Sequence, residues 1–327
     1  MLIISNEMMD RAYGCLFGQL AGDSLGSLVE FKDALEIADL YPCGVRDLKD
    51  GGTWNLLAGQ PTDDSEMALA LARAIAARQG FEESSVAEAY IRWWKSEPFD
   101  IGITTSSGLS ALSIGQSAKS DSQSNGALMR VSPVGIYAAG NPALAAKVAA
   151  RDAALTHPHP ICQSASSAYA AAIASGIGGD DPATMWQTAW DYAHHSPETA
   201  QGSKAVRERL ILAKSEPPYE FYDQMGWVLT ALQNAFFHLL SNKSLEEAVI
   251  WTVGSGGDTD TNAAVCGALL GAAQGGSAVP DRWCDTIAAC RPTIESGAAH
   301  PRPPEYWPTD AGKLTEALLL VSLQTSS

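Results

Sequence analysis

Apolar residues recur three and four positions apart along most of this chain, and no other feature constrains its fold as strongly. This spacing places apolar side chains on one face of a helix, whereas the alternation of β-branched residues that indicates strands is almost absent. The sequence therefore predicts an all-α protein. The predicted helices span residues 10–25, 64–79, 84–95, 126–139, 142–155, 161–175, 182–194, 198–214, 225–241, 244–253, 261–274 and 310–323. The least regular regions are 41–62, 96–125 and 276–308.

Helix boundaries and helix packing can also be predicted. Ser244, with Glu247 three residues later, has the spacing of a capping box, and Ser84 and Ser85 are candidate N-caps. Glycines four residues apart would let two helix backbones approach closely. They are Gly14, Gly18 and Gly22 in one predicted helix and Gly267, Gly271 and Gly275 in another. Since no linker or fixed-period repeat interrupts the pattern, we expect a single compact domain over residues 1–327.

Charge and composition exclude several classes of protein. The 21 Lys and Arg residues stand against 37 Asp and Glu residues, a net charge of −16, and such an acidic surface repels nucleic acid. Two segments without charged residues, 153–179 and 261–280, consist of small residues and are predicted to be buried helices, not membrane spans. The six cysteines form no C-x-x-C pair, and residues 1–10 do not resemble a signal peptide. We therefore expect a cytoplasmic protein with neither nucleic-acid nor membrane partners.

Two acidic motifs precede predicted helices that are rich in alanine. Thr62-Asp63-Asp64 opens the first, and Gly256-Gly257-Asp258-Thr259-Asp260-Thr261 opens the second. The first motif alone is compatible with ordinary helix capping, and the second with a glycine-rich loop that binds phosphate. Because carboxylate and hydroxyl oxygens are ligands for hard cations, the two motifs together predict one shared site, and four carboxylates indicate a pair of divalent ions.

Four further clusters are candidates for the same site. Asp23 lies at the end of a predicted helix and Glu30 follows shortly after it, although this cluster is also compatible with a plain helix end near Gly26. Asp100 lies among apolar residues, where burial would raise the pKa of its carboxyl group. The turn at Ser124-Asn125-Gly126 could offer backbone N–H groups to an anion. His157 and His159 lack soft ligands nearby, so hydrogen bonding or a phosphate contact is favoured over zinc, and His159 is also compatible with a structural role.

The motifs, taken in order, resemble those of the ADP-ribosylglycohydrolase family. The similar segments are 14–31 (GCLFGQLAGDSLGSLVEF), 59–69 (GQPTDDSEMAL), 99–105 (FDIGITT), 124–133 (SNGALMRVSP), 156–160 (THPHP) and 256–271 (GGDTDTNAAVCGALLG). The resemblance implies an all-α fold with two Mg²⁺ or Mn²⁺ ions in a cleft. It implies hydrolysis of the bond between ADP-ribose and an acceptor, foremost arginine on a modified protein. Ile103 departs from the family's usual Asn, beside the expected substrate cleft.

The resemblance also implies roles for individual residues. The implied metal ligands are Thr62, Asp63, Asp64, Asp258, Asp260 and Thr261, and the implied catalytic residues are Asp100 and Glu30. Substrate binding is assigned to Ser124, Asn125, Gly126, His157, Gly256 and Gly257. An alternative is a bacterial immunity protein that neutralises an ADP-ribosyltransferase toxin by hydrolysis, by blocking the toxin's active site, or by both.

Overall fold

The computed structural model describes residues 4–194, 197–219 and 221–325, and helices dominate this part of the chain. No strand occurs in it, only two isolated β-bridges, so the all-α prediction is confirmed. The α-helices are α1 (Asn6–Gly26), α2 (Ala34–Leu40), α3 (Asp63–Arg78), α4 (Glu83–Lys95), α5 (Ile103–Ser113), α6 (Ser132–Tyr137), α7 (Pro142–Ala154), α8 (Pro160–Ile177), α9 (Pro182–Tyr192), α10 (Pro197–Leu212), α11 (Val228–Leu240), α12 (Leu245–Gly254), α13 (Thr259–Gln274), α14 (Asp281–Ala289) and α15 (Ala311–Thr325). Short 3₁₀ turns span Gly276–Ala278, Pro304–Tyr306 and Pro308–Asp310.

Three helices were not predicted, and one predicted helix is much shorter. The missed helices α2, α5 and α14 are short, and α5 is rich in Ser and Thr, so their formation depends on tertiary contacts more than on intrinsic propensity. The helix predicted over 126–139 is reduced to α6, because residues 126–130 form turns and the helix begins only at Ser132.

One of the two capping predictions is confirmed. Ser244 caps α12, and Glu247 completes the capping box. The assignment of Ser84 and Ser85 as N-caps is wrong. The N-cap of α4 is Glu82, and the Ser85 hydroxyl donates to the Glu82 carboxylate.

Helices α1 and α13 form the most extensive helix pair, and glycines line their contact as predicted. A Cβ atom on Gly18 would lie 2.3 Å from the carbonyl oxygen of Gly267, and one on Gly22 would lie 2.1 Å from that of Ala263. The two backbones are therefore in direct contact, which no larger residue would allow. At the end of α1, Gly26 packs against the backbone of Asp260, and the Thr259 hydroxyl donates to the Gly26 carbonyl at 2.7 Å. This contact places the acidic start of α13 beside the end of α1.

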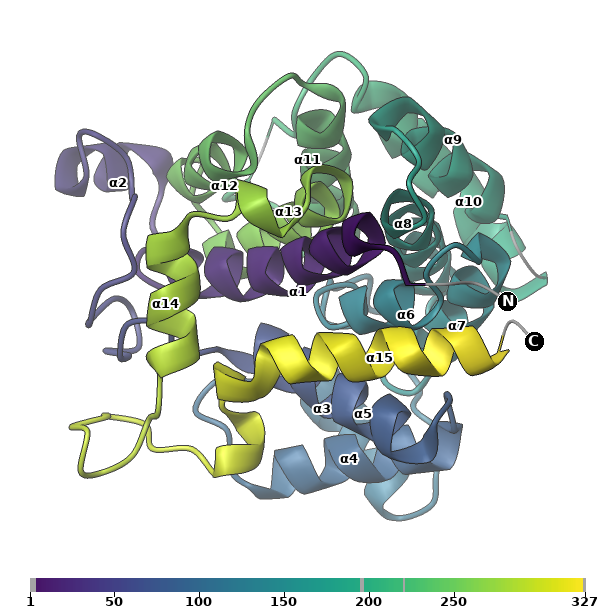
Figure 1. Ribbon diagram of the computed structural model, residues 1–327, viewed down its shortest axis with the longest axis horizontal. Helices are drawn as coiled ribbons and strands as arrows, with labels where there is room; N and C mark the ends of the chain where they lie inside the picture. Colours follow the sequence, from purple (N-terminus) through teal and green to yellow (C-terminus); the bar gives the residue numbers. More distant parts are fainter. Residues whose placement is uncertain (1–3, 195–196, 220, 326–327) are drawn as a thin grey trace.

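Figure 1 shows α1 crossing the middle of the molecule, with α11, α12 and α13 above it and α3, α4 and α5 below. Helix α8 and the part of α13 that follows Asp260 carry no charged residues and are almost entirely buried, as predicted. They contribute to a hydrophobic core shared by helices from α1 to α15. Within the described part of the chain, no helix combines the length and the apolar character needed to span a bilayer.

Candidate active site

A cleft of about 440 Å³ lies where the end of α1 meets the starts of α3, α5 and α13. Six carboxyl groups line it, and none of the described lining residues is Lys or Arg. The six residues are Glu30, Asp63, Asp64, Asp100, Asp258 and Asp260. The cleft therefore concentrates negative charge with no cationic side chain among these lining residues to offset it.

The acidic start of α3 is held by Asp23, which lies near the end of α1 and is fully buried. The Asp23 carboxylate accepts hydrogen bonds from the Thr62 N–H at 3.1 Å, the Thr62 hydroxyl at 2.9 Å and the Ser65 N–H at 3.1 Å. Thr62 is the N-cap residue, but its side chain does not cap the helix. Asp23 thus takes the capping role from another helix and orients Asp63 and Asp64 into the cleft. Its own pKa is raised to about 6 by burial, which these hydrogen bonds partly offset.

The start of α13 faces the same cleft from the other side. The Asp258 carboxylate accepts a hydrogen bond from the Asn125 side chain at 2.8 Å. The Thr261 hydroxyl donates to Asp64 Oδ2 at 3.2 Å, which joins the two acidic motifs. The other oxygen of this carboxylate, Asp64 Oδ1, is buried and has no hydrogen-bond partner among the described residues. Such an orphaned oxygen among carboxylates fits a site that holds cations.

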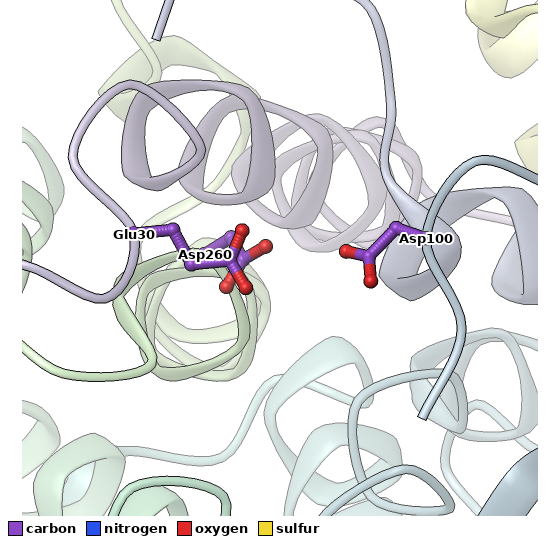
Figure 2. A group of neighbouring side chains, drawn as sticks. All are labelled: Glu30, Asp100 and Asp260. Atoms are coloured by element: carbon purple, nitrogen blue, oxygen red, sulfur yellow. The ribbon is translucent and has the colours of Figure 1, made fainter. Parts of the chain in front are cut away.

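Glu30 and Asp100 reach the cleft from segments outside the helices. Glu30 lies in the turn after α1, and Asp100 lies in the loop before α5. Oxygen atoms of Glu30, Asp100 and Asp260 lie within 4.8 Å of one another. Figure 2 shows the Asp100 carboxylate pointing toward the other two from the opposite side. This spacing is compatible with three ligands for one ion, and with a carboxylate on either side of a reacting water.

The carboxyl groups strongly perturb one another. Burial raises the pKa of Glu30 to about 9 and that of Asp100 to about 7, and neighbouring carboxylates add to both shifts. Burial and then neighbouring carboxylates raise the pKa values of Asp63, Asp64 and Asp260 well above the ordinary range. Perturbed acids gathered in one cleft are typical of a catalytic or metal-binding site.

His157 connects the cleft to a buried ion pair. Its Nδ1 lies 2.8 Å from the Thr156 hydroxyl, and its Nε2 lies 3.0 Å from the Ser124 hydroxyl. Arg130, paired with Asp152 at 3.0 Å, donates to the Thr156 hydroxyl at 2.8 Å. Because Arg130 can only donate, we assign the Thr156 proton to His157 Nδ1 and the His157 proton to Nε2, which donates to Ser124. Burial and the charge of Arg130 lower the pKa of His157 to about 3, so the ring is neutral.

Most of the predicted site residues line the cleft, but three do not. The lining set includes Ser124, Asn125, Gly126, His157 and Thr261. Thr62, Gly256 and Gly257 lie outside that set. The Gly257 N–H donates to the Lys32 carbonyl at 2.9 Å, and a Cβ atom on Gly256 would lie 2.7 Å from the same oxygen. The glycines thus support the turn that carries Glu30, and their assignment to substrate binding stays a prediction.

Ile103, which was expected beside the substrate cleft, lines it and is 87% exposed. Sequence reasoning gave no role to Met225 or Phe31, which also line the cleft. Asp23 was identified only as part of a cluster. A lone Arg130 in a charge-poor segment was the one signal that could have indicated the buried network behind His157.

We expect the protein in EDTA to become less stable as the pH rises from about 5 to about 9. Carboxyl groups whose pKa is raised by folding keep protons that the unfolded chain has released. The unfolded chain releases these protons near the ordinary pKa values of 3.8 and 4.5, whereas the folded protein releases them near pH 7 for Asp100 and near pH 9 for Glu30. The stability that these groups allow is therefore fully present below the ordinary values and is lost as the pH rises through the folded ones. Each such group lowers the free energy of unfolding by up to about 1.4 kcal/mol per pH unit. Urea denaturation at several pH values measures this slope.

The Glu30→Gln variant is the control for this measurement, because it should flatten the profile mainly between pH 7 and 9. A wild-type stability that rises across the whole range would contradict the expectation.

Known proteins with similar sequences and structures belong to one family of hydrolases. Residues 5–310 match the sequence profile of the family described as ADP-ribosylglycohydrolase. The ADP-ribosyl-[dinitrogen reductase] glycohydrolase of Rhodospirillum rubrum is 31% identical over 85% of this chain and 90% of its own length. The ADP-ribosylarginine hydrolase Tri1 of Pseudomonas putida is 26% identical over 86% of this chain and 75% of its own. A solved structure entitled ADP-ribosylglycohydrolase-related protein complex superposes with a TM-score of 0.74 and 26% identity, covering 97% of this chain and all of the other.

The helical fold, the acidic cleft and these similarities define a hydrolase of glycosidic bonds. Since the profile spans almost the whole chain, the protein belongs to the ADP-ribosylglycohydrolase family.

Proposed function

We propose that this protein releases ADP-ribose from arginine side chains of modified proteins and uses two divalent cations, Mg²⁺ or Mn²⁺. The observation that carries the proposal is the cluster of six carboxyl groups in a cleft without Lys or Arg among its described lining residues. The names of two relatives support the substrate, since one is called an ADP-ribosylarginine hydrolase and the other is named for ADP-ribosylated dinitrogen reductase.

The donor set fits hard cations. Carboxylates from both acidic motifs converge, the Thr261 hydroxyl is adjacent, and Asp64 Oδ1 lacks a partner among the described residues. The residues proposed to hold the ions are Asp63, Asp64, Asp258, Asp260, Thr62 and Thr261. When bound, divalent cations would neutralise the carboxylates and act as Lewis acids toward substrate oxygens.

The protein's own groups provide the proton transfer. In the proposed reaction, water attacks the anomeric carbon while the bond to the guanidinium nitrogen breaks. The electron pair of that bond stays on the nitrogen, so arginine departs as a neutral guanidine that takes up a proton from solvent, and a nearby carboxylate accepts the proton of the water. Asp100 is the first candidate for this base, because its carboxylate faces Glu30 and Asp260 across the cleft from a separate loop (Figure 2), and Glu30 is the second.

Substrate contacts are proposed along the opposite wall of the cleft. The Ser124 hydroxyl accepts from Ser122 at 3.1 Å and, in the assigned tautomer, from His157. Its own proton is then directed away from these partners and is available to a ribose hydroxyl or a phosphate oxygen. Asn125 and Gly126 line the same wall.

Incubation with ADP-ribosylated peptides tests the proposal. The purified protein with Mg²⁺ should release free ADP-ribose from an arginine-modified peptide faster than from a serine-modified peptide of the same sequence context. EDTA should stop the reaction, and added Mn²⁺ or Mg²⁺ should restore it. No release from either peptide with either ion would overturn the proposal.

The alternative of a protein that blocks an ADP-ribosyltransferase toxin stays a prediction. It is separated from hydrolysis by a variant with Asp258→Asn and Asp260→Asn, which should bind cations poorly. Protection of cells against such a toxin by this variant would favour blocking, and loss of protection would favour hydrolysis.

A further inference from the structure

Trp54 connects the two candidate catalytic carboxylates, although it lies in the irregular region 41–62, where the sequence indicated no role for it. It lies in a turn closed by paired backbone hydrogen bonds between Gly51 and Leu56, both at 2.8 Å. The indole N–H of Trp54 donates to Glu30 Oε2 at 2.6 Å. Trp54 thus holds one oxygen of the Glu30 carboxylate in a fixed direction.

The turn itself is fixed to the backbone beside Glu30. The Thr53 hydroxyl donates to the Glu30 carbonyl at 2.9 Å, and the Thr53 N–H donates to the Ser27 carbonyl at 3.2 Å. A Cβ atom on Gly52 would lie 2.6 Å from the Cα of Leu28. The position of the indole relative to Glu30 is therefore set by backbone contacts and does not depend on the single side-chain hydrogen bond.

A row of four aromatic rings runs from Phe31 through Trp54 and Phe99 to His300. The ring centroids are 6.4 Å apart between Phe31 and Trp54, 5.9 Å between Trp54 and Phe99, and 4.7 Å between Phe99 and His300. Phe31 directly follows Glu30, and Phe99 directly precedes Asp100. Edge-to-face and stacked contacts of this kind hold rings in defined orientations. The row therefore joins the backbone that carries one carboxylate to the backbone that carries the other.

The far end of the row is anchored in the protein interior. The His300 carbonyl accepts a hydrogen bond from the Gln60 side chain at 2.8 Å. Two residues later, Arg302 is paired with Glu66 at 2.8 Å and donates to the Ser96 carbonyl at 2.9 Å. Ser96 is the C-cap residue of α4, just before the loop that carries Phe99 and Asp100. The loop thus has a rigid support on the side away from Trp54.

We propose that Trp54 is a positioning residue that sets the separation of Glu30 and Asp100 across the cleft. Its N–H orients Glu30 directly, and its ring orients Asp100 through Phe99. The proposal rests on the proposed function, because the separation of two carboxylates affects turnover only if they act together on one reacting water or ion. It predicts two separable effects, one for the N–H and one for the ring.

Two substitutions separate these effects. Trp54→Phe keeps an aromatic ring and removes the N–H, and we expect kcat to fall about tenfold with KM changed less than about twofold. Trp54→Leu also removes the ring contact with Phe99, and we expect a further fall of about tenfold. Trp190→Phe is the matched control, since Trp190 stacks on Trp186 in α9 and lies outside the cleft lining. It should leave both constants unchanged.

A double-mutant cycle with Glu30→Gln distinguishes positioning from general stability. If Trp54 acts through the Glu30 carboxylate, adding Trp54→Phe to the Glu30→Gln variant should lower kcat by less than about twofold. An equal loss of kcat in the wild type and in that variant, or a change confined to KM, would overturn the proposal.

A spectroscopic measurement tests the contact without any turnover. In protein labelled with ¹⁵N, the Trp54 indole resonance, assigned by its disappearance in Trp54→Phe or through connectivities, should shift in Glu30→Gln. The Trp190 indole resonance should not move. A Trp54 resonance that is unchanged in Glu30→Gln would overturn the proposal, whereas a shift in a protein whose wild type releases no ADP-ribose would overturn the proposed function alone.

Discussion

Asp64→Asn should lower turnover and cation affinity by at least about a hundredfold, and the same substitution should stabilise the protein in EDTA. Asp64 is buried, one of its oxygens has no partner among the described residues, and neighbouring carboxylates add to the effect of burial in raising its pKa. Asparagine has nearly the same shape without the charge. The free energy of unfolding in EDTA should therefore rise by about 1–2 kcal/mol, while Mg²⁺ at a concentration that just saturates the wild type should stabilise the wild type much more than the variant.

Calorimetric titration with Mn²⁺, urea denaturation and release of ADP-ribose measure the three effects. Asp39→Asn, on the exposed face of α2, is the matched control and should change none of them. An Asp64→Asn protein with wild-type cation affinity would contradict the assignment of this residue as a ligand. Lower stability of the variant in EDTA would contradict the charge argument.

Asp100→Asn should lower kcat by about 10²–10⁴ while both cations still bind, because the variant cannot accept the proton of the attacking water. The Asp100 carboxylate points toward Glu30 and Asp260 across the cleft (Figure 2). Because Asp100 lies in a loop, its substitution should leave the helices intact. Single-turnover kinetics, together with a Mn²⁺ titration of the variant, measure both properties.

Glu30→Gln is the matched comparison for this prediction. If Asp100→Asn turned over like the wild type while Glu30→Gln was inactive, the base would be Glu30. If Asp100→Asn lost a cation, Asp100 would be a ligand, as its distance from Glu30 and Asp260 allows.

The parts of the site that belong to regular helices could be predicted from local pattern. The acidic residues at the starts of α3 and α13 precede clear helical repeats, and the spacing of Gly18 and Gly267 indicated the close contact that brings the helices together. The geometry of the loops could not be predicted in this way. Asp23 caps a helix that starts about forty residues later, and α5 forms from a Ser- and Thr-rich segment. Trp54 contacts Glu30 through a turn, and no repeat in the sequence reports such a contact.

The pairing of α1 with α13 has a consequence for biosynthesis. Helix α1 leaves the ribosome more than two hundred residues before α13, the helix against which it buries its glycine face. Until that segment has been synthesised, Gly18 and Gly22 have no partner backbone, and α1 exposes an apolar surface to solvent or to a chaperone. A truncated nascent chain that lacks α13 should therefore remain open to proteases, and the acidic cleft should assemble only after α13 has been synthesised.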